Sequence, residues 1–112
     1  GGLRDTQFGP AVMFGLGGIF VEVFKDVSFR IAPVTEYEAL DMIHDVKGSM
    51  ILKGFRNMKA LDISALVKTI VQVSGIMVSE GNIKELDLNP VFVYPKGIIA
   101  VDARIVLHQL TQ

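Results

Sequence analysis

Three side chains near the C-terminal end of the chain have the types and the spacing of a metal site. Asp87 and Asn89 lie two residues apart, and Asp102 follows thirteen residues after Asn89. Mg²⁺ prefers oxygen ligands, usually with only one or two protein carboxylates and with phosphate oxygens completing its coordination shell. The chemistry that this set could perform is therefore the binding of a magnesium–nucleotide complex.

A β-hairpin is predicted to bring these residues together. Residues 94–97 read Tyr-Pro-Lys-Gly, which is typical of a type I turn, because Pro is favoured at its second position and Gly at its fourth. The residues next to the turn, 91–93 (Val-Phe-Val) and 98–101 (Ile-Ile-Ala-Val), are strand-like, and the two arms are expected to span residues 83–93 and 98–107. The sequence therefore predicts a closing hairpin whose turn is centred on residues 95 and 96.

The position of the turn decides which residues face each other across the hairpin. Asn89 would face Asp102, and Asp87 would face the cation Arg104. Directly opposed side chains have Cβ atoms about 4.5–5.5 Å apart, so the four would form one oxygen-rich patch with a cation beside it. Two alternatives stay open. A register shifted by one residue would send Asp102 to the other face, or Asn89 merely ends a strand and Asp102 is a solvated edge residue.

A second motif, residues 14–22, reads Phe-Gly-Leu-Gly-Gly-Ile-Phe-Val-Glu. We reject it as a dinucleotide fingerprint, because Phe20 holds the third glycine position and the residues that follow alternate like a strand. Two interpretations remain for Gly17 and Gly18: they relieve crowding in a tight turn or bulge, or their N–H groups approach a phosphate. Glu22 could point into a site or toward water.

The composition limits the classes of function. The chain has 112 residues, enough for one small domain over 1–112, and its net charge of −1 with no long basic run argues against nucleic acid as a partner. The absence of Cys excludes a disulfide framework and is typical of a cytoplasmic protein. The longest apolar stretch, residues 11–23, contains three Gly and a Glu and is too short to span a membrane.

Two further observations suggest that the chain works with other parts. Its mean hydropathy of +0.44 is high, which predicts that some apolar surface meets another domain or subunit. It opens on Gly1 and Gly2 rather than Met, which suggests that it was cut from a longer polypeptide.

The expected elements are strands followed by helices and then the hairpin. Thr35 and Glu38 have capping-box spacing and begin a first helix that ends near Gly48, and Asp62 is the expected N-cap of a second, longer helix. Strands are expected at residues 11–14, 19–24 and 27–31, and residues 50–53 are ambiguous. This order predicts an α+β fold, with both helices packed on one face of a mixed or antiparallel sheet.

Several segments together resemble one enzyme family. They look like the C-terminal part of the ATP-grasp domain in NDP-forming acyl-CoA synthetases, the ADP-forming acetate–CoA ligases related to the succinyl-CoA synthetase β subunit. The resemblance covers about residues 4–107. The segments that carry it are residues 8–10 (Phe-Gly-Pro), 13–22, 25–27 (Lys-Asp-Val), 30–33 (Arg-Ile-Ala-Pro), 54–56 (Gly-Phe-Arg), 85–90 (Glu-Leu-Asp-Leu-Asn-Pro) and 101–104 (Val-Asp-Ala-Arg).

The resemblance implies the C-terminal lobe of an ATP-grasp fold and a specific chemistry. Family enzymes interconvert acyl-CoA, ADP and phosphate with acid, CoA and ATP through a phosphohistidine. Their ATP-grasp module holds Mg²⁺ and ATP or ADP between two lobes, where catalysis is positioning plus charge stabilisation. The resemblance makes Asn89 and Asp102 Mg²⁺ ligands. Asp87 would either contact the ion directly or contact one of its ligands.

The resemblance also gives roles to the remaining candidate residues. Arg104 would lie near the phosphates and act as a catalytic and nucleotide-binding residue. Gly17 and Gly18 would bind the nucleotide, and Glu22 would be a catalytic residue on the phosphoryl-transfer side.

Several family parts lie outside this sequence, namely the N-terminal ATP-grasp lobe and the CoA-binding and phosphohistidine domains or subunit. We therefore expect these as partners in an oligomeric enzyme, and we expect the isolated chain to be inactive. The alternative is a non-catalytic nucleotide-binding or regulatory module, for example one fused to a protein acyltransferase; a purely structural assembly lobe is a third option.

Overall fold

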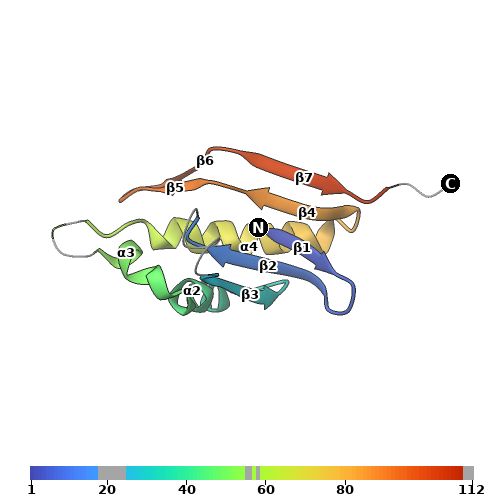
Figure 1. Ribbon diagram of the computed structural model, residues 1–112, viewed down its shortest axis with the longest axis horizontal. Helices are drawn as coiled ribbons and strands as arrows, with labels where there is room; N and C mark the ends of the chain where they lie inside the picture. Colours follow the sequence, from blue (N-terminus) through green and yellow to red (C-terminus); the bar gives the residue numbers. More distant parts are fainter. Residues whose placement is uncertain (18–24, 55–56, 58, 110–112) are drawn as a thin grey trace.

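The computed structural model describes residues 1–17, 25–54, 57 and 59–109, and these form a sheet with helices on one face (Figure 1). All the strand pairs described are antiparallel. The larger sheet has five strands in the order β3-β2-β1-β4-β7, and a separate two-stranded sheet pairs β5 with β6. The strands are β1 (Gly2–Asp5), β2 (Gly9–Gly15), β3 (Val27–Ile31), β4 (Ile83–Leu88), β5 (Val91–Val93), β6 (Ile98–Ala100) and β7 (Ala103–Leu107).

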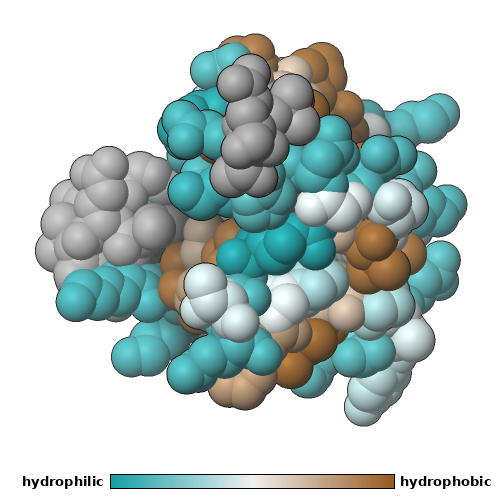
Figure 2. Space-filling model, turned by 90° about the vertical axis from the view of Figure 1, so that its right-hand side faces the viewer, coloured by the Kyte–Doolittle hydropathy of each residue, from teal (hydrophilic) through white to brown (hydrophobic). Residues whose placement is uncertain are grey.

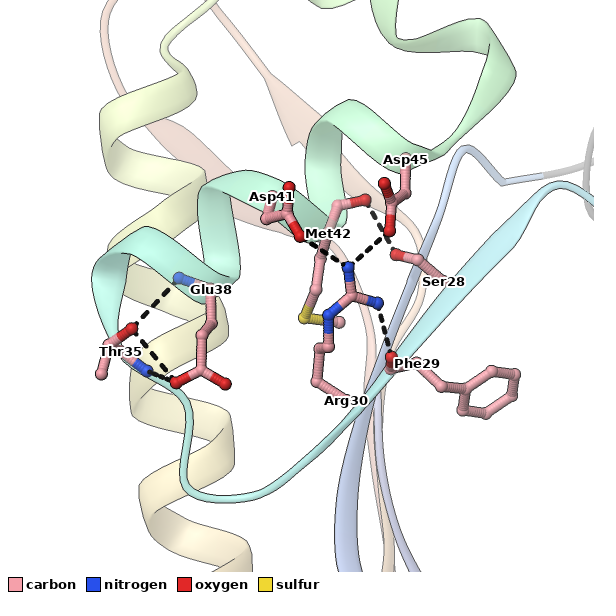
Figure 3. A network of polar contacts seen from close by, with 8 residues as sticks. All are labelled: Ser28, Phe29, Arg30, Thr35, Glu38, Asp41, Met42 and Asp45. Atoms are coloured by element: carbon pink, nitrogen blue, oxygen red, sulfur yellow. Dashed lines mark hydrogen bonds and ion pairs between the residues drawn. The ribbon is translucent and has the colours of Figure 1, made fainter.

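The helices begin where the sequence predicted. In α2 (Glu36–Asp45), the Glu38 N–H donates to Thr35 Oγ1 at 3.1 Å and the Thr35 N–H donates to Glu38 Oε1 at 3.2 Å, which confirms the capping box (Figure 3). The longer helix α4 (Ile63–Ser79) begins at Asp62, whose Oδ1 accepts the Ala65 N–H at 3.0 Å. The predicted α+β class, with its helices on one face of an antiparallel sheet, is confirmed.

The segment between the two helices differs from the prediction in detail. Helix α2 ends at Asp45 rather than near Gly48, and the ambiguous residues form a short third helix, α3 (Met50–Lys53). The reason lies in the buried Asp26, whose carboxylate accepts the N–H groups of Lys47 at 2.7 Å and Gly48 at 2.9 Å. These two bonds hold a 3₁₀ turn (Lys47–Ser49) that redirects the chain into α3.

Strand β1 was not expected from the sequence, and Arg4 fixes it to the end of α4. The Arg4 guanidinium donates to the carbonyls of Met77 at 2.6 Å and Glu80 at 3.2 Å, and its Nε donates to the Ile83 carbonyl at 3.1 Å. A cation at a helix C-terminus satisfies carbonyls that have no partner within the helix. Arg4 therefore joins the central strand of the sheet to the turn between α4 and β4.

The core lies between the sheet and helices α2 and α4. Val12 of β2, Met42 and Ile43 of α2 and Met77 of α4 are each fully buried there. On β3, Arg30 pairs with Asp41 and Asp45 of α2, which ties the edge of the sheet to the helical layer (Figure 3). The core members are Val12, Val34, Ala39, Met42, Ile43, Leu52, Leu66, Val67, Ile70, Val73, Met77, Ile83 and Leu86.

The opposite face of the sheet is partly apolar and exposed. Leu3, Ala11 and Ile31 are paired across β1, β2 and β3 and point away from the helices, because their neighbour Val12 points into the core; of the three, Ile31 is exposed, Leu3 is half-buried and Ala11 is buried. Figure 2 views the molecule from the right-hand end of Figure 1, where hydrophobic patches alternate with hydrophilic ones.

Within the described residues, no helix combines the length and the hydropathy that crossing a membrane requires.

Ser74 of α4 offers a sharp test of this packing. Its buried hydroxyl accepts the Val34 N–H at 3.1 Å and donates to the Val71 carbonyl at 2.7 Å. Ser74→Ala leaves the buried Val34 N–H without its acceptor, so we expect the free energy of unfolding to fall by about 1–3 kcal/mol. Urea unfolding measures the change.

The matched control for this test is Ser79→Ala on the exposed end of the same helix. The Ser79 hydroxyl makes only a 3.5 Å contact to the Ile76 carbonyl, so the change should stay within about 0.5 kcal/mol. Equal unfolding midpoints for the two variants would contradict the assigned role of Ser74.

Candidate functional site

The structure confirms the predicted register of the closing hairpin. Asp87 pairs with Arg104 across β4 and β7, and the Asn89 N–H donates to the Asp102 carbonyl at 3.2 Å. Beyond Asn89 the same register continues into the second sheet, where Val91 pairs with Ala100. The alternative with a one-residue shift is therefore excluded for this hairpin. The structure brings together Asp87, Asn89, Asp102 and Arg104, which we call the oxygen patch.

The turn lies where it was predicted, but its hydrogen bonds differ from those of a simple type I turn. The Tyr94 N–H donates to the Gly97 carbonyl at 3.0 Å, and Gly97 has a φ of 90°, which Gly adopts without strain. In a type I turn the Gly97 N–H would donate to the Tyr94 carbonyl. Here that N–H donates to Asp62 Oδ2 at 2.7 Å, and the Tyr94 carbonyl accepts the Asp62 N–H at 2.7 Å.

The patch lies on the face of the sheet that is turned away from the helices. Leu86 and Leu88 point into the core, so Asp87 between them points to the other face. Asp87 is half-buried, whereas Asn89 and Asp102 are exposed. One oxygen of Asp102 accepts the N–H of the next residue, Ala103, at 2.9 Å. These side chains are thus accessible for ligation from one side.

The glycine segment reaches the same place. A Cβ added at Gly17 would lie 3.8 Å from Asn89 Oδ1, so the Gly17 backbone is next to the oxygen patch. The sequence singled out Gly17 without predicting this contact, which joins the two motifs in space. Gly18, Glu22 and the strand expected at residues 19–24 lie outside the described residues.

Arg104 has an acidic partner that the sequence analysis did not identify. Its Nη1 lies 3.9 Å from Glu85 Oε2, with both side chains largely exposed. Such an exposed ion pair is worth about 0–1 kcal/mol, because water screens it and two long side chains must be ordered. The pair is therefore too weak to hold Arg104 in one orientation. Glu85 stands diagonally across from Arg104, which the predicted register already implied.

The oxygen atoms of the patch suit a metal ion that is also bound by phosphate and water better than one bound by protein side chains alone. Within the part of the chain that the structure describes, no three His, Cys, Asp or Glu side chains are grouped closely enough to hold an ion. The patch instead offers the two carboxylates of Asp87 and Asp102 and the amide oxygen of Asn89. Mg²⁺ commonly binds one or two carboxylates together with phosphate oxygens and water, so the residues present fit that ion.

A cavity of about 260 Å³ lies beside the patch, between β2 and β4 and above α4. Asp87, Asn89 and Gly17 are at its polar side. The rest of its lining is mostly aliphatic, including Val12, Leu66, Ile70 and Val73. The interior therefore suits apolar atoms, and the polar patch at its edge is the part with the chemistry for phosphate and metal.

Comparison with known proteins gives the family context of this geometry. The family model that describes an ATP-grasp domain matches residues 1–107. The chain is 55% identical over 107 residues to the acetate–CoA ligase [ADP-forming] I subunit beta of Pyrococcus furiosus, covering 96% of this chain and 46% of that protein. It is 50% identical over 106 residues to the acetate–CoA ligase [ADP-forming] I of Archaeoglobus fulgidus, covering 95% of this chain and 16% of that protein.

A solved structure is similar in fold as well. The dinucleotide-forming acetyl-coenzyme A synthetase 1 of Ca. Korarchaeum cryptofilum matches with a TM-score of 0.92 and 55% identity, covering 96% of this chain and 50% of that chain. That protein was solved with coenzyme A and Mg-AMPPCP, with its phosphohistidine segment pointing towards the nucleotide-binding site. The chain thus spans half or less of the length of these relatives.

The proximity of the three oxygen-bearing side chains leads to a prediction that does not depend on catalysis. Asn89→Asp places a third carboxylate opposite Asp102 and close to Asp87, and like charges directly opposed across strands are destabilising. We expect a lower melting temperature in chelator and recovery on adding Mg²⁺, measured by thermal unfolding. The exposed Asn82, in the turn before β4, supplies the control Asn82→Asp, which Mg²⁺ should not rescue. Equal responses to Mg²⁺ would contradict the patch.

Proposed function

The chain belongs to the ATP-grasp domain family, and we propose that it is the metal- and phosphate-binding lobe of an ADP-forming acid–CoA ligase. The observation that carries the proposal is the register of the hairpin, which sets Asp87 opposite Arg104 and Asn89 opposite Asp102. The names of the relatives support the reaction, since two of them are ADP-forming acetate–CoA ligases.

In this proposal Asn89 and Asp102 are the Mg²⁺ ligands, and Asp87 ligates the ion or orients a bound water. A bound Mg²⁺ would bridge the phosphate oxygens of ATP or ADP and neutralise their charge during phosphoryl transfer. The half-buried Asp87 provides a carboxylate that is less hydrated than those at the exposed edge, which favours its use as a fixed hydrogen-bond acceptor. The Mg-AMPPCP bound by the similar structure supports this choice of ion and nucleotide.

Arg104 and the glycine segment would hold the phosphates themselves. Arg104 lies directly across from Asp87, so its guanidinium can reach a phosphate held by the metal. The Gly17 backbone lies beside Asn89, where the lack of a side chain lets a phosphate approach closely. Gly18 and Glu22 keep their predicted roles in nucleotide binding and phosphoryl transfer.

The proposed reaction converts acyl-CoA, ADP and phosphate into acid, CoA and ATP through a phosphohistidine. This chain has two histidines, and neither suits the role: His44 is on α2 in the helical layer, and His108 follows β7, beyond the end of the hairpin strand. The carrier histidine, the CoA site and the second nucleotide-binding lobe would come from other parts of the enzyme. The isolated chain would then be inactive.

Removal of one proposed ligand is the direct test. In the complete enzyme, Asp102→Ala should lower acyl-CoA-dependent ATP formation by roughly 100-fold or more, because loss of even an outer-shell partner of a metal costs about 10–100-fold. Circular dichroism and melting temperature should be almost unchanged, since Asp102 is exposed. Glu36→Ala on α2 removes an equally exposed carboxylate far from the patch and should keep full activity. Near-normal turnover of Asp102→Ala at saturating Mg²⁺ would refute the metal assignment.

Calorimetric titration tests whether the site is shared between two lobes. Mg²⁺-ADP and Mg²⁺-ATP are titrated into the 112-residue chain and into the complete protein. We expect Mg²⁺-dependent binding only in the complete protein, because the patch supplies too few ligands to hold the nucleotide alone. Binding by neither would mean that the oxygen patch is structural, and equal binding by both would contradict the shared site.

A further inference from the structure

We propose that Asp62 is a positioning residue for the metal site, which it controls from the far end of the hairpin. The inference rests on the proposed function, because it concerns how Asn89 and Asp102 are held in register. Asp62 itself is the N-cap of α4 and contacts the turn of the hairpin, whereas the patch lies at the other end of β5 and β6. It would therefore act on metal binding without touching metal or nucleotide.

Asp62 caps the helix with one hydrogen bond and joins the helix to the turn with two others. Its Oδ1 accepts the Ala65 N–H at 3.0 Å, which caps α4. Its Oδ2 accepts the Gly97 N–H at 2.7 Å, and its own N–H donates to the Tyr94 carbonyl at 2.7 Å. The two carboxylate oxygens thus have separate tasks, one within the helix and one across to the hairpin.

The hairpin needs this anchor because β5 and β6 pair only with each other among the described strands. An isolated two-stranded hairpin is at best marginally stable in water. Phe92 and Ile99 face each other across this hairpin, and their exposed fractions are 50% and 57%. Val93 does pack against the core, but a single apolar contact does not fix a register. The pairing of β4 with β7 constrains the hairpin at its base, and the Asp62 bonds add a second constraint at the tip.

The constraint reaches the patch through an unbroken series of backbone pairs. From the tip these are Val93 with Ile98, Phe92 with Ile99 and Val91 with Ala100. The Val101 N–H then donates to the Pro90 carbonyl at 3.0 Å, and the Asn89 N–H donates to the Asp102 carbonyl at 3.2 Å. A tip that is held in place therefore holds the two proposed Mg²⁺ ligands opposite each other.

The charge of Asp62 suits this task. The Ala65 N–H first, and then the Gly97 N–H, hold the pKa of Asp62 below its ordinary value. The carboxylate is therefore ionised at neutral pH, and both of its oxygens act only as acceptors. Its contribution to stability is present above the unfolded pKa and is lost as pH falls through the lower folded pKa.

The variant Asp62→Asn separates the two tasks. The Asn side chain keeps one oxygen to cap α4, and Asn is as good an N-cap as Asp. Its amide nitrogen cannot accept the Gly97 N–H, so the tip loses its side-chain bond to residue 62 and keeps only the backbone bond to the Tyr94 carbonyl, while the helix start is retained. Asp62→Ser should behave in the same way, because its single hydroxyl oxygen can serve the cap alone.

We expect a specific kinetic result in the complete enzyme. For both variants the KM for Mg²⁺ should rise by roughly five- to tenfold, a typical size for coupling between two sites, with a smaller change in kcat at saturating Mg²⁺. Hydrogen–deuterium exchange across residues 89–102 should become faster. The melting temperature should change little for Asp62→Asn, because the cap remains.

The control is loss of a cap that has no connection with the hairpin. Thr35→Ala removes the cap of α2 and should lower the melting temperature while the KM for Mg²⁺ and exchange across residues 89–102 stay unchanged. An unchanged KM for Mg²⁺ in both Asp62 variants, with Asp102→Ala inactive, would overturn the positioning role alone. Full activity of Asp102→Ala would instead overturn the proposed function on which it rests.

Discussion

Backbone pairing between the two arms of the closing hairpin is the constraint on which the candidate site depends. The oxygen patch exists because Asp87 pairs with Arg104 and Asn89 bonds to Asp102, and a one-residue slip would place Asp102 on the other face. Two structural features hold this register. Leu86 and Leu88 are packed into the core at the base, and Asp62 holds the turn at the tip.

Local signals made much of this fold predictable from the sequence. Pro95 and Gly97 have the preferences of a turn, and a turn of known position determines every pair in the hairpin. Thr35 with Glu38, and Asp62, are side chains that satisfy helix N–H groups a few residues away, so their effect is visible in a short stretch of sequence. These elements were located correctly because the interactions that determine them are close in sequence.

The features that escaped prediction depend on contacts that are distant in sequence. Strand β1 reads Gly-Leu-Arg-Asp, which has no alternating pattern, and Arg4 fixes it through carbonyls more than seventy residues away. Gly17 meets Asn89 only in the folded chain, and the second oxygen of Asp62 is used only once the turn has reached α4. The roles of Gly18 and Glu22 stay predictions, because both lie outside the described residues.

Buried side chains are concentrated on the helical face of this domain and are few in the hairpin. This is consistent with a metal site whose remaining ligands come from another lobe. The helical face holds the large buried side chains, whereas the hairpin that carries the proposed ligands is narrow and mostly exposed. Elements with few buried contacts are those that open at low free-energy cost, so they can adjust to a ligand. In the proposed enzyme, the nucleotide is held partly by a second lobe and carries the Mg²⁺ with it. A hairpin that is fixed at its tip but exposed along its length would let Asp102 and Asn89 bind that ion. The same Asp62 bonds would limit how far the hairpin moves, because moving the tip would break a bond at the start of α4.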